Sequence, residues 1–184
     1  MNIHNYIETS KANGPGCRFV IWTQGCSIRC DGCFNPSTHE FSTNKEVKTS
    51  EIVDLILSCD NIEGITISGG EPLDQFEEVL QLVKEVKKKT NLSIVIYSGY
   101  ESTEILGTFP KKKIIDYIDV LISGKFKKNN VSKLGNIGSA NQKHIFITDR
   151  YNINDFMSLN CIEYLVSDDG TIHKTGFPTQ RVLK

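Results

Sequence analysis

Short apolar strands alternate with amphipathic helices along this chain, and this alternation most restricts the folds open to it. Gly64 to Ser68 is a compact apolar run, and Leu92 to Tyr97 is a second one. Between them, from Asp74 to Val86, apolar residues recur three and four positions apart, which is the period of a helix with one buried face. Helical crossovers of this kind favour parallel strands in one sheet covered by helices. The sequence therefore predicts an α/β fold.

The other segments extend this pattern. From Thr49 onward, Ile52, Leu55, Ile56 and Cys59 share one face of a predicted helix. Further strands are predicted at Arg18 to Thr23, Asp119 to Ile122 and His144 to Thr148, further helices at Glu101 to Leu106 and Asn152 to Leu159, and a hairpin turn at Asp168-Asp169-Gly170. With 184 residues and 39% hydrophobic content, we expect one domain over residues 1–184. Its mostly parallel sheet should form an open or partial βα barrel.

Charge and hydropathy narrow the choice of partners. The formal net charge is -1 at pH 7, so no positive excess favours a nucleic-acid backbone or an anionic membrane surface. No apolar run approaches the roughly 20 residues that span a bilayer, and Met1 to Ile7 lacks the basic and then apolar order of an export signal. We therefore expect a cytoplasmic protein that binds neither nucleic acid nor membrane.

Three of the six cysteines lie in one short loop, at about residues 24–41, that follows the first predicted strand. Cys26, Cys30 and Cys33 have the spacing CxxxCxxC, and Gly25 and Gly32 permit the tight turns that such a loop needs. Structural disulfides are rare where cellular thiols are reducing, so this clustering indicates metal or redox chemistry.

The number of thiols distinguishes between kinds of metal site. Structural zinc sites and ferredoxin-type clusters each use four protein ligands. Three thiolates on a four-iron cluster leave one iron open to a small ligand. A zinc knuckle completed by His39 or by another cysteine is the main alternative, and three unrelated core cysteines are a further one. In parallel sheets the ligand site lies at the carboxyl ends of the strands, where this loop begins.

The CxxxCxxC spacing followed by Phe34 resembles the signature of the radical S-adenosylmethionine superfamily. The surrounding stretches are similar to the activating proteins of anaerobic ribonucleoside-triphosphate reductase. These stretches are Asn13-Gly14-Pro15-Gly16 with Arg18, Gly25-Cys26, Gly32-Cys33-Phe34-Asn35-Pro36, Ile67-Ser68-Gly69-Gly70-Glu71-Pro72-Leu73, Tyr97-Ser98-Gly99-Tyr100, Ile118 to Phe126 and Gly138 to Gln142. The resemblance covers roughly residues 13–143, whereas the tail at 150–184 matches loosely and His39 replaces an expected aromatic residue.

The resemblance implies that Cys26, Cys30 and Cys33 hold a [4Fe-4S] cluster whose open iron binds the amino and carboxylate groups of S-adenosylmethionine. An electron from the reduced cluster cleaves this cofactor to methionine and a 5'-deoxyadenosyl radical, and the protein orients it. Phe34 is expected beside the adenine, with Gly32 and Cys33 as its neighbours in the cofactor site.

The resemblance also implies a second set of cofactor contacts, after the next two strands. Gly69 and Gly70 let main-chain groups approach the methionine ammonium, and Glu71 adds negative charge for that cation. Ser98 ends the following strand on the same rim and is expected to contact the cofactor. A plain strand-to-helix turn is the alternative interpretation of the Gly-Gly-Glu-Pro stretch. No further catalytic side chain is expected.

The function implied is that of an activase, which removes a hydrogen atom from a glycine of a large glycyl-radical enzyme, here anaerobic ribonucleotide reductase. The sequence has no second cysteine cluster, so we expect an external low-potential reductant such as a flavodoxin or ferredoxin. A radical S-adenosylmethionine enzyme that modifies a peptide or small metabolite is the alternative, and pocket-guarding tail residues would favour it. A non-enzymatic electron carrier or zinc-binding module is a third possibility.

Other polar and sulfur-containing residues receive weaker expectations. Lys125 and the stretch Gly138 to Gln142 are expected to contact the cofactor, the partner or solvent. Isolated cysteines are common core residues, so Cys17, Cys59 and Cys161 are expected to be structural. The four scattered histidines are expected to lie outside the site.

Overall fold

The structure, a computed structural model, describes residues 1–42, 44–107, 110–132, 134, 136–157, 162–166 and 169–177. Its strands are β1 (Asn2–Ser10), β2 (Arg18–Thr23), β3 (Lys45–Glu46), β4 (Gly64–Gly69), β5 (Ser93–Ser98), β6 (Val120–Ser123), β7 (Lys143–Phe146), β8 (Ile162–Val166) and β9 (Ile172–Gly176). Its α-helices are α1 (Thr49–Ser58), α2 (Phe76–Lys89), α3 (Ser102–Gly107) and α4 (Ile153–Met157). Short 3-10 helices are η1 (Pro36–Thr38), η2 (Pro72–Gln75), η3 (Lys111–Tyr117) and η4 (Lys128–Asn130). No helix in these ranges combines the length and apolar composition that a membrane span requires.

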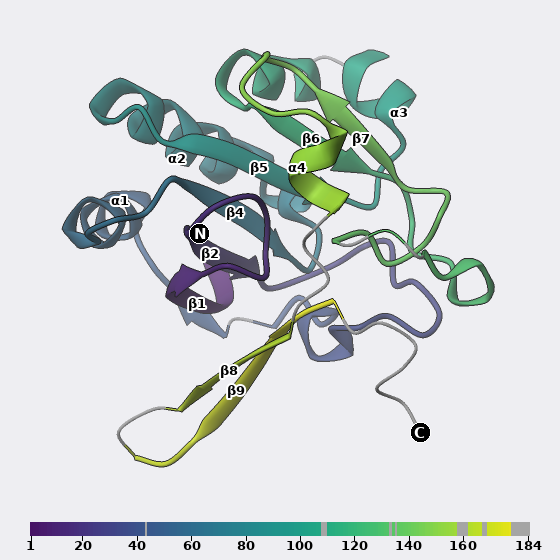
Figure 1. Cartoon of the computed structure of the whole chain (residues 1–184), viewed down its shortest axis with the longest axis horizontal. Helices are drawn as coiled ribbons and strands as arrows, with labels where there is room; N and C mark the ends of the chain where they lie inside the picture. The colour runs from purple at the N-terminus through teal and green to yellow at the C-terminus, as the bar shows by residue number, and fades with distance from the viewer. Residues whose placement is uncertain are drawn as a thin grey trace.

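Strands β1 to β7 form one sheet in the order β3-β1-β2-β4-β5-β6-β7 (Figure 1). The four central strands β2, β4, β5 and β6 run parallel, as the alternation of strands and helices predicts. Strand β7 runs antiparallel to β6, and the described part of the chain between them holds η4 but no α-helix of the kind that usually returns a parallel strand. Strand β1 pairs antiparallel with both β2 and β3. The α/β class is confirmed, with a parallel centre, antiparallel edges and no closure of the sheet.

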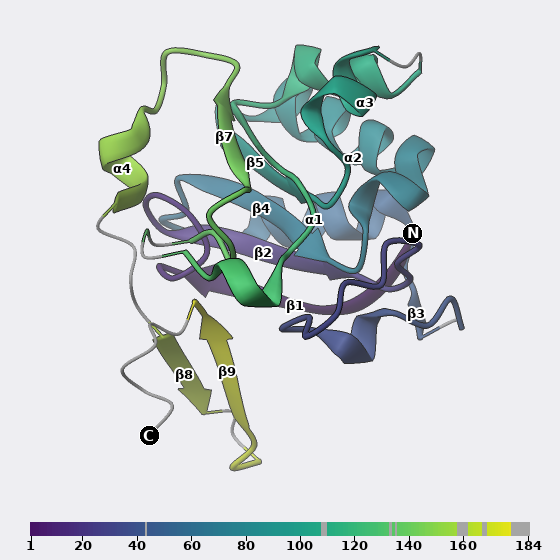
Figure 2. The same ribbon diagram turned by 90° about the vertical axis from the view of Figure 1, so that its right-hand side faces the viewer.

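The two faces of the sheet have different coverings. One face carries the largest apolar cluster, in which Ile21, Ile67 and Ile96 pack with residues of α1, α2 and α3. The other face carries Val95 and Ile122, which pack with Phe156 of α4. Figure 2 shows α4 on the opposite side of the sheet from α2 and α3. Near the carboxyl ends of the strands, part of the second face borders a cavity, and the site described below lies there.

Helix α2 shows how charge and apolar period together define an element. Its buried residues are Val79, Leu80, Leu82, Val83 and Val86. Acidic residues occupy the first turn and Lys87 to Lys89 the last, which suits the helix dipole. Lys87 also forms an ion pair outside the helix, because its Nζ lies 2.7 Å from Oδ2 of the buried Asp119. That carboxylate also accepts hydrogen bonds from Ile94 N and Thr148 Oγ1, and these partners lower its pKa against the opposing effect of burial.

The tail forms a helix and a hairpin. Helix α4 covers the middle of the segment predicted as a helix, whose last two residues lie outside the described ranges. Strands β8 and β9 pair antiparallel, which confirms a hairpin at the predicted place. Gly170 has φ +82 in the connection, a backbone conformation that glycine adopts without strain, whereas Asp168 lies outside the described ranges.

Arg18, at the start of β2, is fully buried beneath the sheet. Its Nε donates to Thr66 Oγ1 at 2.8 Å, and its Nη1 donates to the Pro15 carbonyl and to Ser93 Oγ at 2.9 Å each. Its Nη2 donates to the carbonyls of Ile65 and Ser93 at 2.6 and 3.1 Å. The guanidinium therefore joins β2, β4, β5 and the preceding loop at the amino ends of the strands, a structural task at the end of the sheet away from the cysteines.

Candidate functional site

The cysteine loop leaves the carboxyl end of β2 and closes back on itself. Gly25, with φ +96, turns the chain, and its N–H donates to the Thr38 carbonyl at 2.9 Å. Cys26 N donates to the His39 carbonyl at 3.2 Å, so the two ends of the loop run side by side. The Gln24 side chain donates to the Glu40 carbonyl at 2.7 Å and reinforces this closure. Backbone pairing therefore fixes the loop on the sheet before any ligand is considered.

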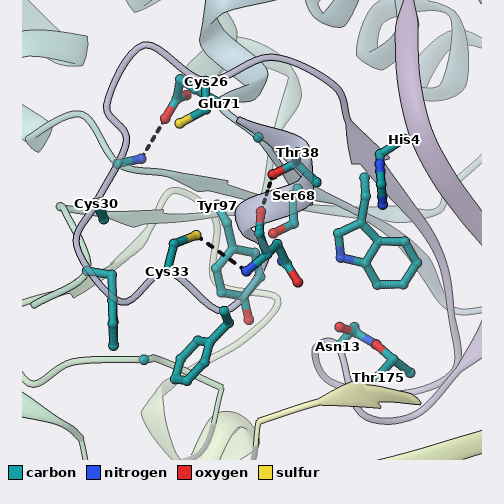
Figure 3. A pocket seen from close by; sticks show the side chains of 18 of the residues that line it. His4, Asn13, Cys26, Cys30, Cys33, Thr38, Ser68, Glu71, Tyr97 and Thr175 are labelled. Carbon is teal, nitrogen blue, oxygen red and sulfur yellow. Dashed lines mark hydrogen bonds between the residues drawn. The ribbon is translucent and has the colours of Figure 1, made fainter. Parts of the chain in front are cut away.

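All three clustered cysteines line one cavity of about 510 Å³, here called the cysteine pocket. Cys26 is buried, Cys30 and Cys33 are half-buried, and Figure 3 shows the three around one side of the pocket. The Cys33 sulfur accepts a hydrogen bond from Asn35 N at 3.4 Å. Burial raises the pKa of the Cys26 and Cys33 thiols above the ordinary value. Metal binding must therefore release protons from this loop, because thiolates are the ligands.

The three thiols lie around the pocket without meeting at one point. Within the described ranges, no three His, Cys, Asp or Glu side chains surround a point that could hold one metal ion. His39 lines the pocket, and its buried Nε2 has no hydrogen-bond partner among the described residues. A four-iron cluster is larger than one ion, so its ligands need not converge on one point. Three free cysteines around one pocket fit the donor set of such a cluster.

The predicted glycine pair joins β4 to the cysteine loop. Gly70 N donates to the Thr23 carbonyl and Glu71 N to the Gly25 carbonyl, each at 2.8 Å. A Cβ at Gly70 would lie 2.1 Å from the Gly25 carbonyl oxygen, and a Cβ at Gly69 would lie 2.5 Å from Thr23 N. Both glycines also line the pocket. The absence of side chains therefore permits loop and strand to touch, and leaves main-chain groups bordering the cavity.

Glu71 and Ser98 bond to each other. Glu71 is 1% exposed; its Oε1 accepts from Leu73 N and Ser98 Oγ at 2.9 Å each, and its Oε2 accepts from Gly99 N at 2.7 Å. Burial raises the pKa of Glu71 to about 7, although these donors oppose the rise. Both residues line the pocket, but the carboxylate joins the ends of β4 and β5. The predicted cofactor contacts of these two side chains stay a prediction.

The raised pKa of Glu71 predicts a pH-dependent stability. The ordinary value is 4.5 and the folded value about 7, so between these pH values the folded chain holds a proton that the unfolded chain has lost. The free energy of unfolding should therefore fall as the pH rises through this window, and Glu71→Gln should lack this contribution. Urea unfolding of both proteins across the window measures it: the wild-type minus variant difference should decrease with pH. The exposed Glu46→Gln is the control, and a pH-independent difference for Glu71→Gln would contradict the assignment.

Phe34 forms half of an aromatic pair at the pocket wall. It is 48% exposed, and its ring centroid lies 4.7 Å from that of Phe126. A Cβ at Gly138 would lie 2.8 Å from both rings, so glycine is needed beneath them. Phe34, Phe126 and Gly138 all line the cysteine pocket, and the two rings, tilted by 44° to each other, offer aromatic faces that suit a nucleobase. Phe126 lies in a stretch that resembles the family, but no role was predicted for it. Its position just after a strand end could have indicated that it lies at the site.

Lys125, the stretch Gly138 to Gln142 and Gly32 lie in different places relative to the pocket. Gly138 and Gln142 line the pocket, and Gln142 donates to the Gly124 carbonyl at 3.0 Å, whereas Lys125 is exposed. Gly32, at the loop tip, is exposed and lies against Lys128, whose Cδ would be 2.9 Å from an added Cβ. The cofactor contacts predicted for these residues therefore stay predictions.

The pocket extends along the face of the sheet that points away from α1, α2 and α3, here called the inner face. The sequence did not lead us to expect residues of this face in the site. Trp22, Ser68 and Tyr97 line this half, each one position along from the isoleucine that faces the helices. Asn13 and Thr175 line it too, and Figure 3 shows them across the pocket from Cys26. The strand alternation that predicted the core isoleucines also held the signal for these inward residues.

The histidines and the isolated cysteines differ in whether they line the pocket. His4, His39 and His173 line the pocket, although the histidines were predicted to lie outside the site. Cys17 and Cys59 do not line it, and the Cys59 thiol donates to the Leu55 carbonyl at 3.2 Å. Cys161 lies outside the described ranges.

Comparison with known proteins agrees with this geometry. A family model described as a 4Fe-4S single cluster domain matches residues 12–145, which supports an iron–sulfur cluster. The chain is 34% identical over 148 residues to a protein of Enterobacteria phage T4, covering 78% of this chain and 92% of that relative. It is 35% identical over 150 residues to one of Vibrio cholerae, covering 77% and 96%. A relative from Escherichia coli K12 is 32% identical over 133 residues, covering 68% and 85%.

All three relatives bear the same name, anaerobic ribonucleoside-triphosphate reductase-activating protein. The match spans most of each protein, and the cysteine loop, the glycine pair and the aromatic pair all fall within the region matched by the family model. The chain therefore belongs to the family of anaerobic ribonucleoside-triphosphate reductase-activating proteins.

Proposed function

We propose that this chain is a radical S-adenosylmethionine activase that generates a glycyl radical on an anaerobic ribonucleoside-triphosphate reductase. The observation that carries the proposal is the cysteine pocket: three thiols, an aromatic pair and a glycine strand end border one cavity at the carboxyl ends of parallel strands. The names of the relatives support the choice of partner. No other side chain needs to act as a catalytic acid or base in this proposal.

Each part of the pocket has a proposed task. Cys26, Cys30 and Cys33 hold the [4Fe-4S] cluster. When bound, the cluster supplies the electron that cleaves S-adenosylmethionine, whose adenosyl fragment removes hydrogen from the partner's glycine. The Phe34 and Phe126 rings form the wall for the adenine, with Gly32 at the nearby loop tip. Gly69 and Gly70 present main-chain groups to the methionine end of the cofactor.

Glu71 and Ser98 hold the backbone around this site in place. Their mutual hydrogen bond and the Gly99 N–H donation hold the ends of β4 and β5 together, so the glycine pair keeps its place beside the cysteine loop. A bound ammonium group nearby would favour the ionised carboxylate and lower its pKa again. This arrangement is the chain's means of orienting the methionine end.

Further parts of the proposal concern the surroundings of the site. We take the open sheet as an incomplete βα barrel in one domain, because its parallel centre directs the strand ends to one pocket. Thiolate ligands and a reducible cluster favour a reducing compartment, the cytoplasm. The electron must come from another protein such as a flavodoxin or ferredoxin, since the sequence has no second cysteine cluster.

The function is tested with the cognate anaerobic reductase. Anaerobically reconstituted protein is mixed with S-adenosylmethionine, dithionite and the intact reductase, and electron paramagnetic resonance is recorded. The expected result is a glycyl-radical doublet on the reductase that depends on all three components. Cofactor cleavage without any doublet would contradict the activase assignment.

One observation favours the second candidate, a radical enzyme that modifies a peptide or small metabolite. Tail residues His173 to Phe177 line the cysteine pocket and narrow its far side. An enclosed pocket suits a small substrate better than a protein loop. Formation of 5'-deoxyadenosine that is accelerated by a peptide or metabolite but never by the reductase would select this candidate.

A further inference from the structure

The β8–β9 hairpin lies outside the residues matched by the family model, yet it is fixed to the sheet domain at its base. Glu163 accepts hydrogen bonds from Ser10 Oγ and, at 2.8 Å, from Lys11 N. Asn13 Nδ2 donates to Thr175 Oγ1 at 2.9 Å. These contacts tie both strands to the end of β1 and the loop after it, so the hairpin has a defined position relative to the pocket.

The two faces of the hairpin differ sharply. Glu163 and Thr175 lie on the face that contacts the body. The opposite face carries Tyr164, Val166 and Ile172, which are 60%, 70% and 64% exposed, and Lys174; we call these four residues the hairpin outer face. Val166 pairs directly with Ile172, and Tyr164 with Lys174. A two-stranded hairpin with a bare apolar face is marginal in water, and a gathered exposed apolar surface marks an interaction site.

The outer face is continuous with the cysteine pocket. Lys174 belongs to the outer face and also lines the pocket. Gly176 and Phe177, which follow it along the chain, line the pocket too. Phe177 stacks on the Tyr97 ring, with centroids 5.9 Å apart, at the inner face of the sheet. Figures 1 and 2 show the hairpin projecting from the rest of the chain. A polypeptide lying on the outer face is thus led along β9 to the pocket that holds the cysteines.

We propose that the hairpin outer face docks an extended, apolar polypeptide segment of the glycyl-radical enzyme, next to the glycine that enters the cysteine pocket. This inference rests on the proposed function. A projecting row of apolar side chains suits an extended chain with apolar residues at alternate positions, because such a chain matches the repeat of the strand. The reductase segment is favoured over a second copy of this protein, because the outer face joins the pocket at Lys174 and the polypeptide that enters the pocket is the reductase's glycine segment.

The test compares two double variants of the full-length protein. Val166→Thr with Ile172→Thr makes the outer face polar while keeping β-branched side chains that favour strands. Val166→Ile with Ile172→Val keeps the face apolar. Neither residue lines the pocket, and Leu57→Ser, at a 45% exposed position on α1, is the remote control. Affinity for the intact cognate reductase is measured anaerobically by titration calorimetry, and 5'-deoxyadenosine formation with dithionite alone is measured in parallel.

The Thr/Thr variant should bind the reductase at least about tenfold more weakly, a change of about 1.4 kcal/mol. Its glycyl-radical yield should fall at low reductase concentration and recover at high concentration. The apolar double variant and Leu57→Ser should stay within about twofold of the wild type. Wild-type affinity of the Thr/Thr variant would overturn the inference, and so would a loss of self-association with unchanged reductase binding. Failure of the proposed function is distinguishable, because the wild type itself would then form no 5'-deoxyadenosine or no glycyl radical.

Discussion

Replacing Cys30 with alanine should remove the iron–sulfur cluster and lower S-adenosylmethionine cleavage by more than about 100-fold. Loss of a residue that only hydrogen-bonds to a metal ligand already lowers metal affinity or activity by about 10–100-fold, and loss of the ligand itself should cost more. The variant keeps two thiolates in the loop, one fewer than the proposed cluster needs. Iron content, the visible absorption of the cluster and 5'-deoxyadenosine formation measure the effect after anaerobic reconstitution.

Cys59→Ala is the matched control. Cys59 is also a free cysteine, but its thiol bonds to the Leu55 carbonyl at the end of α1 and does not line the pocket. This variant should keep the wild-type iron content and cleavage rate. Equal losses in the two variants would show that the ligand assignment is wrong.

Replacing Arg18 with methionine should destabilise the fold by about 3–5 kcal/mol, because several buried acceptors lose their donor and each group left unsatisfied costs about 1–3 kcal/mol. Methionine keeps much of the side-chain volume but donates no hydrogen bond. The carbonyls of Pro15, Ile65 and Ser93 would lose their Arg18 donor in a buried place. Urea unfolding measured by circular dichroism gives the loss of unfolding free energy.

Arg29→Ala is the comparison for this effect. Arg29 pairs with Glu40 at 3.3 Å, but the two side chains are 51% and 70% exposed, so the pair should contribute below about 1 kcal/mol. A similar small loss for Arg18→Met would contradict the structural role assigned to the buried guanidinium. The Arg18 variant should also lose stability without any change in which residues line the pocket, since it lies at the other end of the strands.

The fold could be predicted where local pattern and tertiary environment agree. Strands β4 and β5 are largely buried, and β-branched residues recur along both, with Ile65 and Ile67 in β4 and Ile94 to Ile96 in β5. Strand β1 was missed because a register irregularity between Ile3 and Asn5 interrupts the alternation of its side chains. The direction of β7 could not be inferred from its own residues, because it depends on the path that the chain takes between Ser123 and Lys143.

The site was predictable in its local part and hidden in its long-range part. Three thiols within eight residues of one loop can be recognised from the sequence, because their spacing alone brings them close together. The bond between Glu71 and Ser98 joins residues 27 positions apart, and it depends on the register of two strands. The contact of Asn13 with Thr175 spans 162 positions, so no pattern of neighbours indicates that the tail reaches the pocket.

We propose that Cys26, Cys30 and Cys33 hold a four-iron cluster with one iron open to S-adenosylmethionine. Metal analysis of the anaerobically reconstituted protein, combined with quantification of 5'-deoxyadenosine after addition of dithionite and S-adenosylmethionine, tests this proposal. We expect about four irons per chain and 5'-deoxyadenosine in amounts that require the cofactor and the reductant. Zinc in place of iron, or an intact cluster that forms no 5'-deoxyadenosine, would contradict it.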